Sequence, residues 1–479
     1  MLHALAFRPT PTQPAPPRQQ RKIAMHETMI LGAGPGGTGP LIWAASAGRL
    51  QSWLERGVVV IDQHERMGGT VGRYALNADT LGSTFLECLG GAGRTDGIVG
   101  LRDDCTAQAL AEYRDSLPPL ALVGHFLERL GEALAGELQR SRRSRFVGGL
   151  RVRALRLGRD GSVTAELSDG RGRRRWLQAA SAVLALGGRQ QHDWENVVLA
   201  PDVSLARWRD KLMPSDRLLT RGGALLAAAR LARHAGTPRA VILGGSHSAF
   251  SAAWTLLEKL PGVAFVERGV QILHRSPPRV FYPSRQAAQN DGYAFAEADV
   301  CPATGRVHRL GGLRGDGRDL WRRYQGLDGS RGETRLAVQP IGALAAADIV
   351  ALLDAADLIV PAFGYRLATV PVFAPDGSRV ALARSGPSVD ADARLRTEDG
   401  GALANVFGIG LGSGFRPWGT MAGEPGFRGQ QNSLWLYQHG LGALVHDGVR
   451  QWAAQRRAYA PAAPIARRPP DLIPLEGFA

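Results

Sequence analysis

A glycine-rich turn and an acidic residue one strand later could together bind a dinucleotide. The apolar segment 28–31 runs into Gly-Ala-Gly-Pro-Gly-Gly at 32–37, and a second apolar segment ends at Asp62. Glycines at this spacing permit a tight turn, the close approach of a pyrophosphate, and contact between helix and strand. The carboxylate of Asp62 could accept hydrogen bonds from two ribose hydroxyls. The expected binding residues are Gly32, Gly34, Pro35, Gly36, Gly37 and Asp62.

Two other interpretations of this turn stay open. Glu55 is an acid nearer to the usual separation from the first glycine, but it precedes the apolar segment, so we expect it on the helix. A glycine turn can also be structural and hold no ligand. The strand before the turn, the helix after it and the acid at the next strand end favour a bound nucleotide.

The same pattern occurs again in the second half of the chain. An apolar segment at 240–243 leads into Gly-Gly-Ser-His-Ser-Ala at 244–249, then a helical pattern and a further apolar segment that ends at His274. The interval from the first glycine to the end of the second apolar segment is the same in both copies. We therefore predict two βαβ units that each bind a dinucleotide. The second would use Gly244, Ser246, His247, Ser248, Ala249, His274 and Arg275.

The second copy differs from the first at the ribose position. His274 and Arg275 stand where the first copy has its acid, and Arg279 follows closely. An aspartate would repel a ribose 2′-phosphate, whereas these side chains can pair with it. We therefore expect NADPH rather than NADH. Ser246, which replaces the middle glycine of the turn, leaves less room for the pyrophosphate to approach the backbone. The alternative is a second unit that is structural and binds no nucleotide.

The elements between the copies indicate how these turns are positioned. Residues 119–139 have helical periodicity, and the apolar segment 182–186 runs into a glycine pair. A similar strand-to-glycine segment recurs at 357–365. Short strands joined by Asp-Gly turns, typical of an antiparallel meander, are expected at 150–157, 162–167 and 176–179.

This order predicts an α/β fold with two Rossmann-like dinucleotide-binding domains, the first of them discontinuous and carrying an inserted β-meander. We expect residues 25–205 and 367–479 to form the first domain and residues 206–366 the second. Residues 1–24 contain five prolines followed by basic residues, which is typical of a disordered tail. A cleaved or artefactual extension before Met25 is the alternative.

The composition favours a soluble protein with no metal site. The chain has 479 residues and a net charge of +15, carried almost entirely by arginine. Clustered cations can bind nucleic acid or anionic membranes, but the runs at 142–145 and 171–175 lack interleaved aromatic residues, so we expect a solvated surface. No segment has the uncharged length of a membrane span. Three widely spaced cysteines predict neither a disulfide framework nor a zinc site, and indicate a cytoplasmic setting.

The two units and the strand-to-glycine segments, in this order from Thr28 to about Trp452, resemble the two-dinucleotide-binding flavoproteins. The resemblance implies FAD in the outer domain and NADPH in the inner one. Disulfide reductases of this superfamily carry a cysteine pair just after a Gly-Gly, but here Gly68 and Gly69 are followed by Thr70 with no cysteine, so that activity is not expected. The further FAD-binding residues are expected to be Gly69, Thr70, Val152, Gly410 and Gln431.

Within this superfamily the chain is more similar to the NADPH-dependent single-component flavin monooxygenases, including the amine N-hydroxylases. Their late motif, an aspartate followed by ATGY, is matched by Asp357 and by 362–365, with phenylalanine in place of threonine. Their FxGxxxH fingerprint is matched in degenerate form by Leu186, Gly188 and His192. The alternative is that the glycines merely end a strand and that the histidine is an exposed loop residue.

The resemblance implies an NADPH-dependent FAD monooxygenase that oxygenates a small molecule with molecular oxygen through a flavin hydroperoxide. In such enzymes the cofactor carries the chemistry and the protein supplies a dry, aligned pocket, so no catalytic residue is assigned. The alternatives are a reductase or oxidase that inserts no oxygen, and a nucleotide-binding sensor or scaffold without turnover. A helix that begins near Gln431 could direct its amides at the flavin pyrimidine. Four tryptophans could line a substrate pocket or pack in the core: Trp43, Trp254, Trp418 and Trp435.

Overall fold

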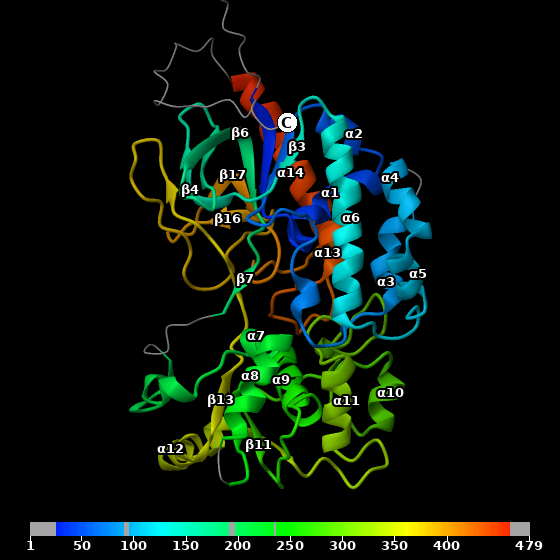
Figure 1. Cartoon of the computed structure of the whole chain (residues 1–479), viewed down its shortest axis with the longest axis vertical. Coiled ribbons are helices and arrows are strands. Elements are labelled where there is room, and N and C mark those ends of the chain that lie inside the picture. The colour runs from blue at the N-terminus through cyan, green and yellow to red at the C-terminus, as the bar shows by residue number, and fades with distance from the viewer. Residues whose placement is uncertain (1–24, 91–94, 191–196, 234–235, 460–479) are drawn as a thin grey trace, which may run out of the picture.

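The computed structural model describes residues 25–90, 95–190, 197–233 and 236–459, which form two α/β units. The expected tail at residues 1–24 lies outside the described residues. Figure 1 shows the larger unit above, built on a nine-stranded sheet, and the smaller unit below, built on a four-stranded sheet. The predicted α/β class with two dinucleotide-binding units is confirmed.

Five parallel strands form the centre of the larger sheet, in the order β3-β2-β1-β6-β17. The apolar residues of β1 and β2 are buried, as expected for a parallel sheet covered on both faces. The strands are β1 (His26–Leu31), β2 (Val58–Ile61), β3 (Arg145–Val147), β6 (Arg174–Leu184) and β17 (Ala402–Gly408).

An antiparallel meander extends this sheet. β4 (Arg151–Leu157) pairs with β5 (Val163–Ser168), and β5 pairs with the first half of β6. The prediction of separate strands at 176–179 and 182–186 is wrong, because β6 is continuous and its second half pairs with β1 and β17. One long strand therefore belongs to both the meander and the parallel sheet. The short strands β15 (Val372–Phe373) and β16 (Arg394–Arg396) complete the sheet.

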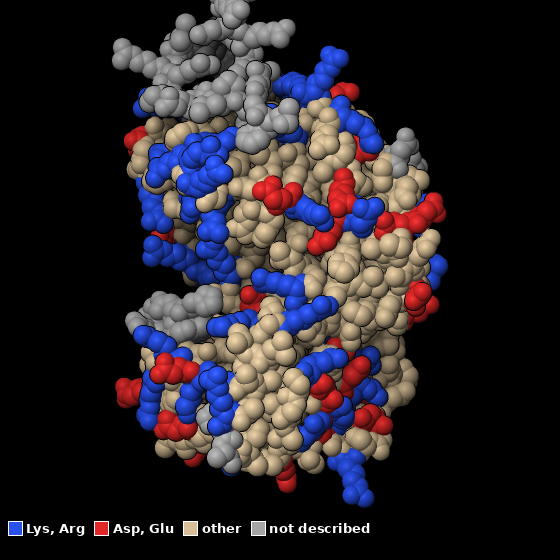
Figure 2. Space-filling model, viewed as in Figure 1, with Lys and Arg blue, Asp and Glu red and all other residues tan. Residues whose placement is uncertain are grey.

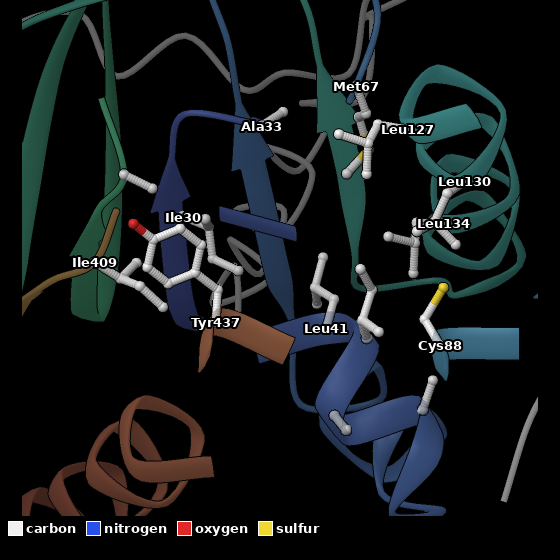
Figure 3. Close-up of a cluster of buried hydrophobic side chains, with 14 of the residues drawn as sticks. Ile30, Ala33, Leu41, Met67, Cys88, Leu127, Leu130, Leu134, Ile409 and Tyr437 are labelled. Atoms are coloured by element: carbon white, nitrogen blue, oxygen red, sulfur yellow. The ribbon is translucent and has the colours of Figure 1, made fainter. Parts of the chain in front are cut away.

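Helices pack against the parallel part of this sheet and hold the first glycine turn in place. α1 (Pro35–Ser46) follows β1, and α6 (Leu120–Arg140) buries an apolar stripe, as its periodicity predicts. Figure 3 shows part of the resulting core, to which β1, α1 and α6 all contribute side chains. The other helices of this unit are α2 (Leu50–Leu54), α3 (Gly82–Leu86), α4 (Asp96–Val99), α5 (Cys105–Ala111), α13 (Leu434–Gln438) and α14 (Gly440–Tyr459).

The smaller unit repeats the order of strand, turn, helix and strand. Its sheet is entirely parallel, in the order β12-β11-β10-β13, and α9 (His247–Glu258) connects β10 to β11. Its strands are β10 (Ala240–Leu243), β11 (Val270–His274), β12 (Leu336–Pro340) and β13 (Leu358–Pro361). The other helices are α7 (Ser215–Leu218), α8 (Arg221–Leu231), α10 (Arg285–Asn290), α11 (Gly315–Tyr324) and α12 (Ala346–Ala355).

The chain passes between the two units in two segments that pair with each other. β7 (Gly188–Arg189) leads out of the larger unit, and β14 (Arg366–Leu367) leads back into it as its antiparallel partner. We propose that the domains divide at this pair, so that the expected boundary at 366 and 367 is kept and the expected one at 205 and 206 moves back toward β7. The reason is that Val203 and Leu205 pack with Val241 and Leu243 in the core of the smaller unit. A short hairpin of β8 (Val198–Ala200) and β9 (Val203–Ser204) follows β7.

The arginine-rich surface contains many ion pairs. Arg173 lies 2.7 Å from Asp169, and Arg174 lies 2.9 Å from Glu166. Figure 2 shows basic and acidic side chains close together over the smaller unit and the right side of the larger one, and a mostly basic strip at the upper left. These contacts favour a solvated surface over a dedicated nucleic-acid site. Among the described residues, no helix has both the length and the apolar character needed to cross a bilayer.

Protonation of His26 should destabilise the fold below neutral pH. Burial, and then the cation of Arg145, lower the pKa of His26 to about 4. In the unfolded chain this pKa returns to about 6.5. At a pH between these two pKa values, the unfolded state binds a proton at this residue that the folded state does not. The free energy of unfolding therefore decreases as the pH is lowered, by at most ~3 kcal/mol from this residue.

Urea titrations at about pH 7 and about pH 5 would measure this effect. We expect His26→Gln to lose less stability than the wild type between the two conditions. His125→Gln is the matched control, because His125 is exposed. An equal loss in wild type and His26→Gln would contradict the prediction.

Candidate functional site

The first glycine turn is held so closely to the sheet that side chains would not fit. The N–H of Gly32 donates to the carbonyl of Ile61 at 2.7 Å, and the φ of Gly32 is +109°. A Cβ on Gly32 would lie 2.2 Å from the carbonyl oxygen of Ala185, and one on Gly37 would lie 1.9 Å from that of Gly32. α1 therefore begins directly at the end of β1, with its first amides at the turn.

A cavity of about 950 Å³ runs past this turn and is large enough for a dinucleotide. A Cβ on Gly36 would lie 3.1 Å from the Cα of Gly410, and one on Gly69 would lie 2.9 Å from the Cα of Gly34. These four glycines form a cradle that side chains would fill, as expected where a pyrophosphate approaches the backbone. The predicted binding residues that line the cavity are Gly32, Gly34, Pro35, Gly36, Asp62, Gly69, Thr70, Val152 and Gly410.

Two residues predicted for this site, Gly37 and Gln431, are not among those that line the cavity. Gly37 lies behind the turn, where it permits contact between helix and strand. The prediction of a helix that begins near Gln431 is wrong, because α13 begins at Leu434 and Ser433 is its N-cap. Asn432 and Ser433 line the cavity in its place.

Asp62 follows β2 and is oriented by the turn itself. Its Oδ2 accepts a hydrogen bond from the N–H of Ala33 at 2.6 Å, and its Oδ1 accepts one from the N–H of His64 at 2.8 Å. Glu55, by contrast, caps the end of α2 and is exposed. The geometry therefore favours Asp62 over Glu55 as the ribose ligand.

A polar network joins the cavity to the smaller unit, and sequence reasoning missed it. Arg73, Tyr74 and Tyr365 line the cavity, and all three donate to the carboxylate of Asp216 in α7. The donor–acceptor distances are 3.2 Å from Arg73 Nη2, 2.5 Å from the Tyr74 hydroxyl and 3.1 Å from the Tyr365 hydroxyl. Burial, and then the charge of Asp216, raise the pKa of Tyr365 above its usual range, so its hydroxyl stays protonated.

The second glycine turn repeats the geometry of the first. The N–H of Gly244 donates to the carbonyl of Leu273 at 2.9 Å, and its φ is +142°. A Cβ on Gly244 would lie 2.5 Å from the carbonyl oxygen of Ala362. Ala362 and Ala185 occupy equivalent places, since each N–H donates at 2.8 Å to the strand before its turn. The predicted duplication is confirmed in the backbone of both units.

The charged groups near the second turn differ in exposure. His274 is 7% exposed, and burial lowers its pKa, so it carries no charge at neutral pH. Arg275 and Arg279 are exposed and are the better source of charge for a ribose 2′-phosphate. The ring Nε2 of His247 lies 2.8 Å from the carbonyl oxygen of Gly312, which directs this ring toward the protein.

The remaining residues predicted for the second nucleotide lie at or next to the start of α9. Ser246 is its N-cap, with extended backbone and no capping bond from its side chain, and Ser248 follows in the first turn. Ala249 is fully buried at the position equivalent to Gly37. None of the second-copy residues lines the cavity of about 950 Å³, so the second nucleotide would bind outside it.

Two further sets of predicted residues have separate outcomes. The glycine of the FxGxxxH match lies in β7, whereas His192 lies outside the described residues. Trp435 lines the cavity, Trp43 and Trp254 pack against hydrophobic cores, and Trp418 is 49% exposed.

In the described ranges, no three His, Cys, Asp or Glu side chains converge as metal ligands.

Comparison with known proteins decides the family. No protein-family model matches the chain. The CMP-5′-(3-aminopropyl)phosphonate hydroxylase of Streptomyces rubellomurinus is 34% identical over 430 residues, which cover 88% of this chain and 96% of that protein. The chain belongs to this family of flavin monooxygenases. Membership of a hydroxylase family agrees with the oxygenation of a small molecule that the sequence resemblance implies, with FAD and NADPH as the expected cofactors.

Solved structures share the fold across nearly the whole chain. The FAD-bound cadaverine monooxygenase DfoA of Erwinia amylovora has a TM-score of 0.51 at 12% identity, covering 93% of this chain and 98% of that one. The ornithine hydroxylase PvdA of Pseudomonas aeruginosa has a TM-score of 0.50 at 14% identity, covering 89% and 99%. The residues of the glycine cradle thus lie in a fold that is known to hold FAD in DfoA.

Proposed function

We propose that the enzyme hydroxylates the primary amine of a small molecule that is carried on a nucleotide. The observation that carries this proposal is the 34% identity, across 88% of the chain, to a hydroxylase named for an aminopropylphosphonate joined to CMP. The cavity supports it, because its lining adds hydroxyl and aromatic groups to the glycine cradle. These include Thr80, Thr84, Phe85 and Trp435.

The proposed reaction balances without any metal. Amine, O₂, NADPH and a proton give hydroxylamine, water and NADP⁺, so one oxygen atom enters an N–H bond and the other leaves as water. Bound FAD would supply hydride acceptance and oxygen activation. The glycine cradle would hold its pyrophosphate and Asp62 its ribose, while buried Tyr437 and Phe85 exclude water from the cavity.

Product analysis of the purified, FAD-loaded enzyme tests this function. NADPH and air would be supplied with CMP-linked aminopropylphosphonate, with the free aminophosphonate, and with no amine. We expect a hydroxylamine one oxygen atom heavier than the CMP-linked substrate, and NADPH oxidation that this substrate accelerates. NADPH oxidation that yields hydrogen peroxide and leaves every amine unchanged would instead establish an oxidase.

Removal of the Arg275 side chain should weaken the preference for NADPH over NADH. A charge-assisted hydrogen bond to the 2′-phosphate contributes about 1.5–3 kcal/mol, so the KM for NADPH should rise about 10- to 100-fold in Arg275→Ala. The KM for NADH should stay unchanged, because NADH lacks this phosphate. Arg239→Ala is the control, since Arg239 is exposed at the opposite end of the same sheet, just before β10. Equal changes for both coenzymes would contradict the assignment.

We also propose that the enzyme works in the cytoplasm. Its three cysteines form no disulfide among the described residues, as is usual in a reducing compartment. They are Cys88, Cys105 and Cys301.

A further inference from the structure

Two side chains, those of Glu87 and His439, hold the indole ring of Trp435 in a fixed position beside the cavity. Trp435 Nε1 donates to Glu87 Oε2 at 2.9 Å, and the ring of His439 stacks on the indole with centroids 4.5 Å apart and planes 18° apart. His439 is itself held, because its Nδ1 lies 2.7 Å from the Trp435 carbonyl and its Nε2 lies 3.6 Å from Glu87. We call these three residues the Trp435 platform.

The platform lies where the cavity meets solvent. Trp435 lines the cavity together with Phe85 and Thr84 of α3, whereas the side chains of Glu87 and His439 are 45% and 39% exposed. The ring of His439 covers one face of the indole. A ligand in the cavity would therefore contact the opposite face or the edge of the Trp435 ring. A fixed, partly exposed aromatic surface of this kind suits a planar ligand group that stays near the entrance.

The chemistry of a nucleotide-linked amine matches this position. Such a substrate has a small reactive amine at one end and a bulky planar base at the other. The amine must reach the inner part of the cavity, whereas the base is large and tolerates solvent. Every nucleobase has a flat π-face that stacks favourably on an aromatic side chain.

We propose that the Trp435 platform is the subsite that binds the nucleobase of the substrate. This inference rests on the proposed function, because it requires a substrate that carries a nucleotide. Trp435 is then a specificity residue: it favours nucleotide-linked amines over the same amines in free form. Its indole is positioned before the ligand arrives, so little side-chain freedom is lost on binding.

Binding of CMP to the FAD-loaded enzyme, measured by calorimetry, tests this assignment. Loss of base–aromatic stacking in Trp435→Ala should weaken CMP binding about 5- to 100-fold. Trp435→Phe should recover part of the loss, because a phenyl ring still stacks. Trp418→Ala is the matched control: this indole is also exposed and donates a hydrogen bond, to the Ala391 carbonyl at 2.9 Å, but it does not line the cavity.

The outcomes separate this inference from the proposed function. If the wild type binds CMP and Trp435→Ala binds it equally well, the subsite lies elsewhere and only this inference fails. If Trp435→Ala is purified without FAD, the ring belongs to the cofactor site and the inference fails as well. If the wild type does not bind CMP and hydroxylates free amines, the nucleotide-linked substrate class itself is wrong. Full FAD content with weakened CMP binding in Trp435→Ala supports the assignment.

Discussion

Gly37→Ala will yield an enzyme that does not retain FAD. The new Cβ would lie 1.9 Å from the carbonyl oxygen of Gly32, so α1 would have to move away from the turn. The helix has no free space on its other side, because a Cβ on Gly39 would already lie 2.5 Å from the carbonyl oxygen of Tyr437. Displacement of α1 would pull its first amides away from the pyrophosphate. The measurement is the visible absorbance of flavin that co-purifies with the protein.

Two further variants keep this prediction testable if Gly37→Ala fails to fold. Gly36→Ala places a Cβ 3.1 Å from the Cα of Gly410, inside the cradle, so it should fold but bind FAD weakly. Gly136→Ala in α6 is the control, since a Cβ there meets nothing within 4 Å and alanine favours a helix. Full flavin content in Gly37→Ala and Gly36→Ala would show that the cradle is not the FAD site.

The glycine turns were predictable because their chemistry is local in sequence. Gly32 and Gly244 each lie between an apolar strand and a helix, and the backbone geometry around both follows from that order alone. Ala185 and Ala362, which the two turns contact, also follow recognisable apolar strands. The structure of such a turn can be predicted from the sequence, because the residues that determine it are neighbours along the chain.

Predictions that depended on distant packing were less successful. β6 was expected as separate strands, because the sequence does not show that one strand can pair with the meander at one end and with β1 at the other. His274 was expected to pair with a ribose 2′-phosphate, and the burial that lowers its pKa is set by tertiary packing around β11, which the sequence does not show. α13 begins at Leu434 because the hydroxyl of Ser433 accepts from the N–H of Leu436 at 3.2 Å, a cap that the sequence analysis overlooked.

The Asp216 network shows the same limit at the site itself. Asp216 is separated from its three partners by 142 to 149 residues in sequence, so no motif spacing links them. Tyr365 was part of a recognised motif, but its partner was not. Only the fold reveals that α7 of the smaller unit reaches side chains that line the cavity proposed to hold FAD.

Asp216→Asn should slow the reduction of bound FAD by NADPH about 10- to 100-fold. The carboxylate of Asp216 binds one cation and two hydroxyls that line the cavity proposed to hold FAD, while its own helix belongs to the unit predicted to hold NADPH. Asparagine keeps one acceptor oxygen but loses the charge that pairs with Arg73. A hydrogen bond to a charged group contributes about 1.5–3 kcal/mol. If this contribution is lost in the transition state for hydride transfer, the rate of flavin reduction falls about 10- to 100-fold.

Anaerobic stopped-flow measurement of flavin reduction isolates this step from oxygen chemistry and from the amine substrate. FAD content and NADP⁺ affinity should be unchanged in Asp216→Asn, so that the rate falls without a matching loss of binding. Asp354→Asn is the matched control, because Asp354 also binds an arginine and an aromatic donor, Arg207 at 2.8 Å and Trp208 Nε1 at 2.7 Å, but wholly within the smaller unit. A wild-type reduction rate in Asp216→Asn would show that the network is structural, and an equal slowing in Asp354→Asn would trace the effect to general destabilisation of the smaller unit.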